Sequence, residues 1–217
     1  MKDAIDTPHL FLLAGLWLGY FLVHSLLASH TVKRRVAQRL PRLAAHYRLG
    51  YNLLALLLLI PPLWLTYRQP GPMLWSWPGP WGWLADGAAL LALVGFWLGS
   101  RAYDLPAFLG LRPQAPLPAG TRLQLSPLHR YVRHPWYSCG LLLLWSRDMN
   151  ASLLVGALAI TLYLVIGSRL EERKLEREIG AAYREYRRQV PGLLPLPWRI
   201  PGRTAWERLR GKAAGRD

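Results

Sequence analysis

The sequence predicts an all-α polytopic membrane protein with about five transmembrane helices and a cytoplasmic helical extension of the last span. Three observations carry this prediction. Hydrophobic residues make up 52% of the 217 residues, although the formal charge is +15, a combination that is rare in a soluble domain of this size. Several apolar stretches approach the roughly 17 to 25 residues that cross a bilayer. The basic residues are confined to alternate connections between these stretches.

The apolar stretches cover residues 10–28, 49–67, 83–100 and 151–168, and a shorter one covers residues 136–146. The first is expected to be retained as a span. It follows the acidic start "MKDAID", exceeds the 7 to 15 apolar residues of a signal peptide and precedes a basic block. The two last stretches are predicted to form a helical hairpin that turns at residues 147–150.

The distribution of Lys and Arg orients the spans. Six lie between the first and second stretches, five between the third and the 136–146 stretch, and thirteen beyond residue 168, whereas only Lys2, Arg68 and Arg147 lie on the opposite side. Basic residues collect in cytoplasmic loops. We therefore expect an N-terminus outside and a C-terminus in the cytoplasm.

The same basic excess predicts attraction to anionic membrane lipids, at about 1 kcal/mol per residue near the surface. It does not require nucleic acid as a partner, because most of the eleven Trp residues lie near span ends, as in an interfacial belt. Cys139 is the only cysteine, which excludes an intrachain disulfide and a Cys-rich zinc site, and no metal site is predicted.

Two connections stand out by composition. "WSWPGPWGW", residues 75–83, is interpreted as an interfacial plug in preference to a binding lid. Residues 109–127 contain four prolines and form the longest nonhelical connection, which is predicted to pack over a site at the cytoplasmic face.

Beyond residue 168 an apolar stripe continues into a charged segment. The stripe follows helical spacing and predicts a single helix that Pro191 ends. Its members are Glu172, Leu175, Ile179, Tyr183, Tyr186 and Val190. We expect one integral-membrane domain over residues 1–200, with a functional core at 121–195, and a basic cytoplasmic tail at 201–217 that lies on the headgroups or is disordered.

Glu172 is the only charged residue of this stripe, so its carboxylate is predicted to lie on the packed face of the helix. A buried carboxylate needs a cationic or hydrogen-bonding partner. Two interpretations stay open: an ion pair with an arginine such as Arg133, or a carboxylate kept for a cationic ligand.

The pentapeptide "RHPWY" precedes the shorter apolar stretch. Pro135 pushes His134 out of helical geometry, which predicts a break at the cytoplasmic mouth of this span. The break is either a headgroup anchor, with Trp136 in the belt, or a site at which Arg133, His134 and Tyr137 offer donors and an aromatic face.

"RHPWY" and the later "EERKLEREIGAAYREYRRQVP" together resemble the signature of the integral-membrane methyltransferases typified by isoprenylcysteine carboxyl methyltransferase and phospholipid N-methyltransferases. The signature covers residues 131–191. "HSLLASHTVKRR", "YRLGYNLLALL", "YDLPAFLGLRP" and "VPGLLP" extend the resemblance to the NnrU-like branch, which includes bacterial methanethiol S-methyltransferases. His129, in "SPLHRYVRHP", departs from the usual Gly-Pro-Tyr-x-Tyr approach to the motif.

The resemblance implies S-adenosylmethionine as cofactor, and a bacterial inner membrane as location. It implies that the cofactor site is formed by Arg133, His134, Pro135, Tyr137, Glu171, Glu172, Tyr183 and Tyr186. Between the two glutamates, Glu172 is predicted to point inward, because it lies on the packed stripe. S-adenosylmethionine carries a sulfonium, an amino group and a carboxylate. A site for it needs a carboxylate, an arginine and aromatic faces that attract the sulfonium.

The methyl acceptor is expected to be a small or lipophilic thiol, similar to methanethiol. Catalytic candidates are Glu172 and, for contact with a thiolate, Arg187, Arg188 and His24. His24 has two further interpretations, as a structural residue or as a haem ligand. Alternatives for the whole chain are methylation of a prenylcysteine carboxylate or a phospholipid amine, a haem-binding NnrU-like isomerase or redox protein, and a noncatalytic scaffold.

Overall fold

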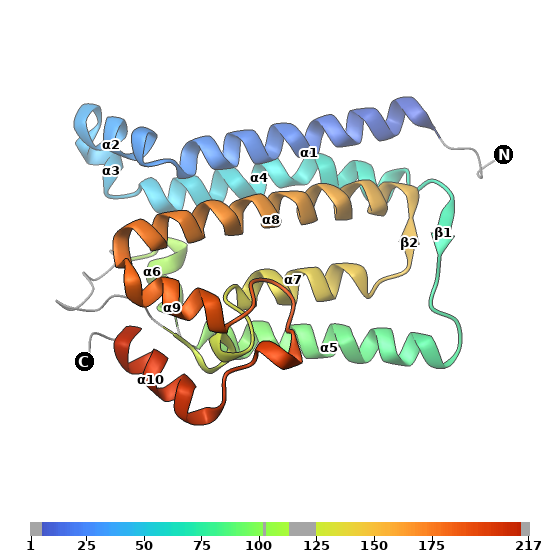
Figure 1. The fold of residues 1–217 in the computed structure, drawn as a ribbon. Helices are drawn as coiled ribbons and strands as arrows, with labels where there is room; N and C mark the ends of the chain where they lie inside the picture. Colours follow the sequence, from blue (N-terminus) through green and yellow to red (C-terminus); the bar gives the residue numbers. More distant parts are fainter. Residues whose placement is uncertain (1–5, 102, 113–124, 214–217) are drawn as a thin grey trace. The chain divides into compact units, whose positions relative to one another are not determined.

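The computed structural model describes residues 6–101, 103–112 and 125–213, and nearly all of its regular structure is helical (Figure 1). Among these residues, four helices are long and apolar enough to cross a membrane: α1 (Thr7–Ala28), α4 (Tyr47–Arg68), α5 (Pro80–Ser100) and α8 (Ala151–Ile179). This confirms the prediction of an all-α polytopic membrane protein. The chain divides into two compact units, and α8 runs from the first into the second at residues 161–162.

In the first unit, α1 packs along α4 (Figure 1). Leu13, Trp17 and Leu65 form its buried core, together with apolar side chains from the first part of α8. The short helices α2 (His30–Arg39) and α3 (Pro41–Ala44) connect α1 to α4. Asp6 caps α1 by accepting a hydrogen bond from the His9 amide.

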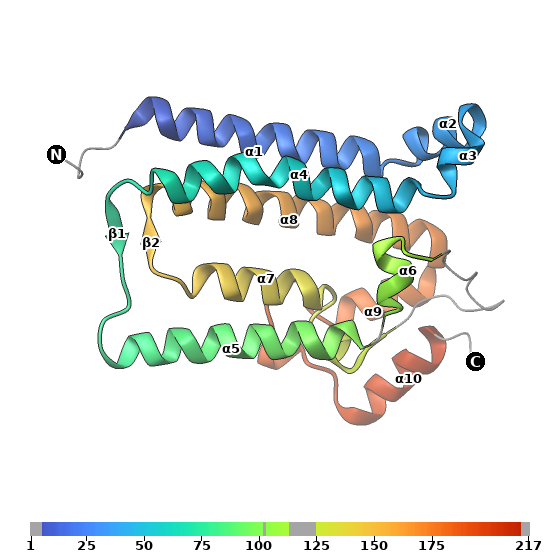
Figure 2. The ribbon, with the colours of Figure 1, turned by 180° about the vertical axis from the view of Figure 1, so that it is seen from behind.

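Helix α6 (Leu105–Leu109) lies against the start of α4 (Figure 2). Asn52 on α4 donates to the carbonyl of Leu109, which closes the end of α6. Gly110 follows with φ +83°, and a Cβ there would lie 2.5 Å from the backbone nitrogen of Leu49. Only glycine fits this approach.

A two-stranded antiparallel ribbon, β1 (Met73–Trp75) with β2 (Met149–Asn150), completes the first unit. Beside it, Ser152 donates to the carbonyl of Gln69 at 2.6 Å and accepts from His9 Nε2 at 3.0 Å, with both His9 and Ser152 buried. The ribbon therefore holds the start of α8 next to the end of α4.

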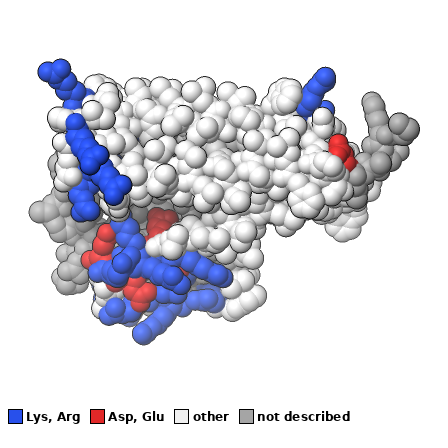
Figure 3. Space-filling model, turned by 90° about the horizontal axis from the view of Figure 1, so that it is seen from above, with Lys and Arg blue, Asp and Glu red and all other residues white. Residues whose placement is uncertain are grey.

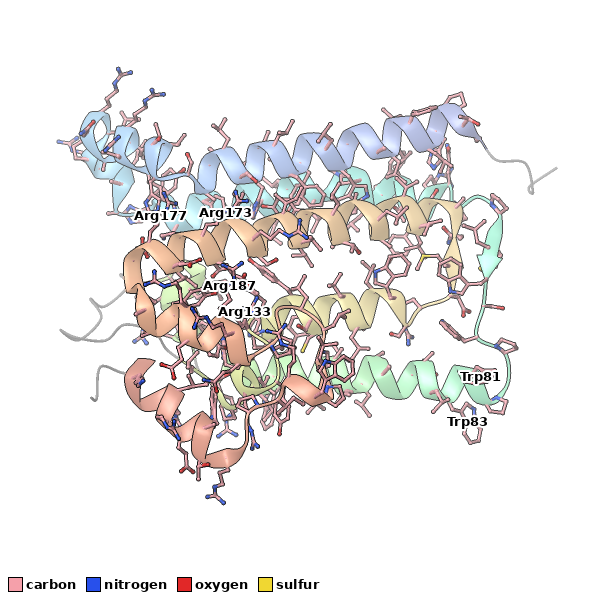
Figure 4. All side chains as sticks on the ribbon, viewed as in Figure 1. Trp81, Trp83, Arg133, Arg173, Arg177 and Arg187 are labelled. Atoms are coloured by element: carbon pink, nitrogen blue, oxygen red, sulfur yellow. The ribbon has the colours of Figure 1, made fainter. Side chains whose placement is uncertain are left out.

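In the second unit, α5 packs against α7 (Pro135–Trp145) (Figures 1 and 2). Gly95 and Gly99 allow the approach, since a Cβ at either position would lie within 2.6 Å of Cys139 Sγ or Trp136 Nε1. At the other end Arg147 pairs with Asp86 at 3.1 Å. Trp81 and Trp83, in the first turns of α5, are exposed (Figure 4), as in an interfacial belt.

Helix α7 is the fifth predicted span, and it has only 11 residues. At 1.5 Å per residue it is about 16 Å long, so it does not cross a hydrocarbon core of about 30 Å by itself. It nevertheless carries the chain from Gly99, near one end of α5, back to Asp86 near the other. The chain therefore runs antiparallel to α5, as predicted, although α7 is shorter than a membrane span.

The predicted single helix after residue 168 is wrong, because α8 ends at Ile179 and α9 (Ala181–Gln189) begins after Gly180. Gly180 has φ +72° and ψ −130°, a conformation that side-chain-bearing residues rarely adopt. The stripe still predicts burial correctly. Leu175 and Ile179 from α8 contact the cluster formed by Tyr183, Tyr186 and Val190.

The C-terminal tail is not a free segment where it is described. Residues of helix α10 (Arg203–Ala213) pack on α9, and Trp206 and Leu209 are buried in the same cluster as Tyr183 and Tyr186. Lys212 also pairs with Glu185 at 2.9 Å. On the face that Figure 3 shows, charged side chains gather towards the two ends, and the surface between them is almost entirely uncharged. Within the predicted loop 109–127, residues 113–124 lie outside the described residues.

Candidate functional site

The backbone break at "RHP" lies where the prediction placed it. His134 is the N-cap of α7 and Pro135 occupies its first turn. The freed amides donate to the segment that follows α9: Arg133 N to the Pro191 carbonyl at 2.8 Å, and His134 N to the Gly192 carbonyl at 3.2 Å. Protein backbone therefore satisfies the amides of Arg133 and His134 at the break.

The Arg133 side chain joins three elements of the second unit. Its Nε and Nη2 donate to Glu172 Oε1 at 2.9 and 2.6 Å, and its Nη1 donates to the carbonyls of Arg187 and Val190 at the end of α9. Only 10% of this side chain is exposed. Of the two interpretations of Glu172, the structure contains the ion pair with Arg133.

The two carboxylate oxygens of Glu172 have unequal surroundings. Oε1 accepts from Arg133 twice and from His134 Nε2 at 3.1 Å, which places a proton on that nitrogen. Oε2 has a looser ionic contact, with Arg187 Nε at 3.4 Å. Glu172 is 6% exposed, so a buried carboxylate has one oxygen saturated and the other only weakly engaged.

Arg187 lies beside Arg133 (Figure 4), but its side chain is half-exposed. Its strongest contact is with Glu176, from Nη1 to Oε2 at 2.8 Å. Glu176 is not among the residues predicted for the site. Its signal was present, since Glu172 and Glu176 are four residues apart and such pairs share a helix face.

His134 also contacts Glu171 and Tyr137. Its Nδ1 lies 3.6 Å from Glu171 Oε2, and its ring stacks on that of Tyr137 at 5.4 Å between centroids with an interplanar angle of 7°. His134 is buried, whereas 48% of the Glu171 side chain is exposed. Glu172 is therefore the inward member of the pair, as the stripe predicts.

Tyr183 and Tyr186 lie in the hydrophobic cluster beneath α10, with 2% and 3% exposure. The Tyr186 hydroxyl donates to the carbonyl of His129 at 2.9 Å. Burial raises the pKa of both phenols above the ordinary value, so they remain neutral donors. Their predicted contact with a cofactor stays a prediction.

His129 stabilises the approach to the break, in the short helix η1 (Pro127–Arg130). Its Nδ1 accepts from the amide and the hydroxyl of Ser126 at 3.0 and 2.8 Å. Burial lowers the pKa of this imidazole to about 4, and a neutral ring is what the accepting Nδ1 requires. The departure from the usual sequence thus supplies a local cap.

Comparison with known proteins identifies the family. The chain is 34% identical over 182 residues to methanethiol S-methyltransferase 2 of Bradyrhizobium diazoefficiens, which covers 81% of the chain and 69% of the relative. It is 33% identical over 196 residues to methanethiol S-methyltransferase of Mycobacterium tuberculosis, with 84% and 77% covered. The chain belongs to this family of membrane methyltransferases. No protein-family profile and no solved structure matches it.

The chain is therefore a membrane methyltransferase, and the family resemblance predicted from its motifs is confirmed. A third relative, methanethiol S-methyltransferase of Pseudomonas sp. (strain GM41(2012)), is 31% identical over 194 residues, 83% of the chain and 71% of the relative. The membrane location agrees with the four long apolar helices.

Two candidates for thiolate contact lie in different surroundings. Arg188 is exposed on α9, next to Arg187. His24 belongs to the first unit of the methyltransferase, where its Nε2 lies 2.6 Å from the Tyr51 hydroxyl and its ring lies beside Tyr20. The interpretation of His24 as a haem ligand stays a prediction.

The segment after α9, residues 191–193, accepts hydrogen bonds at the break of the methyltransferase and was not predicted as part of the site. A Cβ on Gly192 would lie 3.3 Å from Arg133 Nη2 and 3.9 Å from Glu172 Oε1. Ser138 donates to the next carbonyl, that of Leu193, at 2.6 Å. The available signal was "VPG" directly after a helix, because Pro ends the helix and Gly permits a close approach.

Proposed function

We propose that this methyltransferase uses S-adenosylmethionine as donor and methylates the sulfur of a small or lipophilic thiol such as methanethiol. The observation that carries the proposal is the buried Glu172, with one weakly engaged oxygen, in a chain similar to methanethiol S-methyltransferases. When bound, the donor supplies an electrophilic methyl group on a positively charged sulfur.

The residues of the second unit fit such a donor. Glu171, Glu172 and Glu176 oppose Arg133 and Arg187, which leaves one negative charge within the connected cluster when His134 is neutral. A donor with two positive groups and one carboxylate carries the complementary charge. The stacked rings of His134 and Tyr137 offer an aromatic face for its sulfonium.

Each residue has a definite task in this proposal. Arg133 and His134 hold Glu172 Oε1, so that the carboxylate orientation is set before a ligand arrives. Glu172 Oε2 binds a positive group of the donor and Glu171 adds charge at the exposed side. Pro135 keeps the break open. Tyr183 and Tyr186 support the wall below α9 through their packing with α10.

The acceptor must lose a proton before it attacks, because the thiolate is the nucleophile. A cation near the sulfur lowers the pKa of the thiol. Arg187 and Arg188 on α9 are candidates for this cation. Contact of His24, which belongs to the first unit, with the thiolate stays a prediction from the sequence. Positioning then supplies the main catalytic effect, about 7 to 11 kcal/mol for well-oriented reactants.

We propose that this chemistry takes place at the cytoplasmic face of a bacterial inner membrane. The N-terminus is outside and the C-terminus inside, because 24 of the 27 basic residues then lie on the cytoplasmic side. The proposed donor site lies in the predicted core at 121–195. Membrane lipids are the remaining partners.

The test uses purified protein, methyl-labelled S-adenosylmethionine and an acceptor panel of methanethiol, longer alkyl thiols, a prenylcysteine and phosphatidylethanolamine. We expect label in a volatile or lipophilic thioether. Label in a methyl ester or a methylated amine would replace the thiol as acceptor. The matched variants are Glu172→Gln, expected to be inactive, and Glu178→Gln, which removes the same charge from an exposed position on α8.

A further inference from the structure

Glu176 pairs with Arg187, and the proposed function gives Glu176 no task beyond its charge. Glu176 lies one helical turn beyond Glu172 on α8, and Arg187 reaches across from α9. The guanidinium has two carboxylates within reach: Glu176 Oε2 at 2.8 Å from Nη1, and Glu172 Oε2 at 3.4 Å from Nε. The first is a full hydrogen bond and the second is a looser ionic contact.

The side chain of Arg187 can move between these two carboxylates, whereas its backbone cannot. Its carbonyl accepts from Arg133 Nη1 at 3.1 Å and from Arg199 Nη2 at 3.4 Å, so the backbone at the end of α9 is held. Its side chain is 47% exposed. A small rotation of this side chain would exchange a contact with Glu176 for one with Glu172.

Such an exchange matters because Oε2 is the only weakly engaged oxygen of the Glu172 carboxylate. Oε1 already accepts from Arg133 and His134. An Arg187 guanidinium seated fully on the carboxylate would form a strong charge-assisted pair with Oε2. It would then compete with any cationic ligand for that atom.

We propose that Glu176 is a positioning residue that holds the Arg187 guanidinium away from Glu172, and so keeps Glu172 Oε2 available to the cationic methyl donor. This inference rests on the proposed function. On this inference Arg187 is a competitor that Glu176 restrains, which leaves Arg188, of the two arginines proposed on α9, as the candidate cation for the thiolate.

The test is a double-mutant cycle on donor binding, measured by calorimetric titration of the purified protein with S-adenosylmethionine. Glu176→Gln is made in the presence of Arg187 and in an Arg187→Gln background. We expect Glu176→Gln to weaken binding roughly tenfold when Arg187 is present, as for loss of one hydrogen bond to a charged group. In the Arg187→Gln background the same change should alter affinity less than about twofold.

Two controls separate positioning from charge and from folding. Glu178→Gln removes a carboxylate from the same helix, where Glu178 pairs with Lys174, and should leave affinity unchanged. S-adenosylhomocysteine, which lacks the sulfonium charge, should discriminate less between the variants. Unfolding midpoints in detergent show whether each variant remains folded.

Several outcomes would overturn the inference. An equal effect of Glu176→Gln in both backgrounds would mean that Glu176 acts by its charge alone. Weaker donor binding by Arg187→Gln itself would make Arg187 a ligand. If wild-type protein binds the donor and the cycle is additive, only this inference fails; if wild-type protein binds no donor, the proposed function fails with it.

Discussion

Replacing Glu172 with Gln tests the structural core of the site. The change preserves the size of the side chain and removes the charge that Arg133 and His134 face at 2.6 to 3.1 Å. Breaking a buried ion pair from one side costs about 3 to 5 kcal/mol, because the remaining charge stays buried. Arg133 keeps its contacts with the carbonyls of Arg187 and Val190. We therefore expect a loss near the lower limit, about 3 kcal/mol.

The measurement is the free energy of unfolding, obtained by titrating the purified protein from mild detergent into dodecyl sulfate. Glu171→Gln is the matched control. The Glu171 carboxylate is next in sequence to Glu172, but it is half-exposed, and its Oε2 lies 3.6 Å from His134 Nδ1. Its loss should be below about 1 kcal/mol. Equal effects of the two substitutions would refute the reasoning, because they would show that burial of the Glu172 pair contributes nothing.

Three further predictions concern other parts of the second unit. Gly180→Ala, at φ +72°, should destabilise the protein by about 1 to 3 kcal/mol, measured in the same titration, and an unchanged value would contradict the bend between α8 and α9. Trp206→Ala should cost about 3 to 5 kcal/mol, because Trp206 is buried against Tyr183 and Tyr186; a loss below about 1 kcal/mol, typical of an exposed side chain, would contradict the packing of α10 on α9. The pKa of His129 is lowered to about 4 in the folded protein from 6.5, so the unfolded chain binds the proton first. Its contribution is complete above pH 6.5 and is lost as the pH falls towards 4, by about 3 kcal/mol in total. His129→Gln should flatten this slope, and a slope that is unchanged in the variant would assign it to another group.

Much of the fold could be predicted because apolar length and loop charge are local properties of the sequence. Among the described residues, the four long helices cover four of the five predicted spans. The short α7 was predicted as well, because the apolar stretch at residues 136–146 differs from the helix by one residue at each end. The bend at Gly180 was hidden, because both helices present the same apolar stripe to one cluster, so periodicity continues across the break.

The part of the candidate site that could be predicted consists of residues whose own local sequence is unusual. A proline break and a carboxylate on an apolar stripe indicated His134, Pro135 and Glu172, and the structure joins His134 to Glu172 at 3.1 Å. The roles of Glu176 and Gly192 depend on distances between segments, which no single segment encodes. Glu176 acquires a partner only because α9 turns back at Gly180 and brings Arg187 beside α8.

Direct binding of the donor tests the central claim most closely. Wild-type protein and its Glu172→Gln and Glu178→Gln variants would each be titrated with S-adenosylmethionine in a calorimeter at pH 7. The account predicts saturable one-site binding to wild-type protein and to Glu178→Gln, and at least a hundredfold loss for Glu172→Gln, about 3 kcal/mol for a charge-assisted contact. Undiminished affinity in a folded Glu172→Gln variant would contradict it.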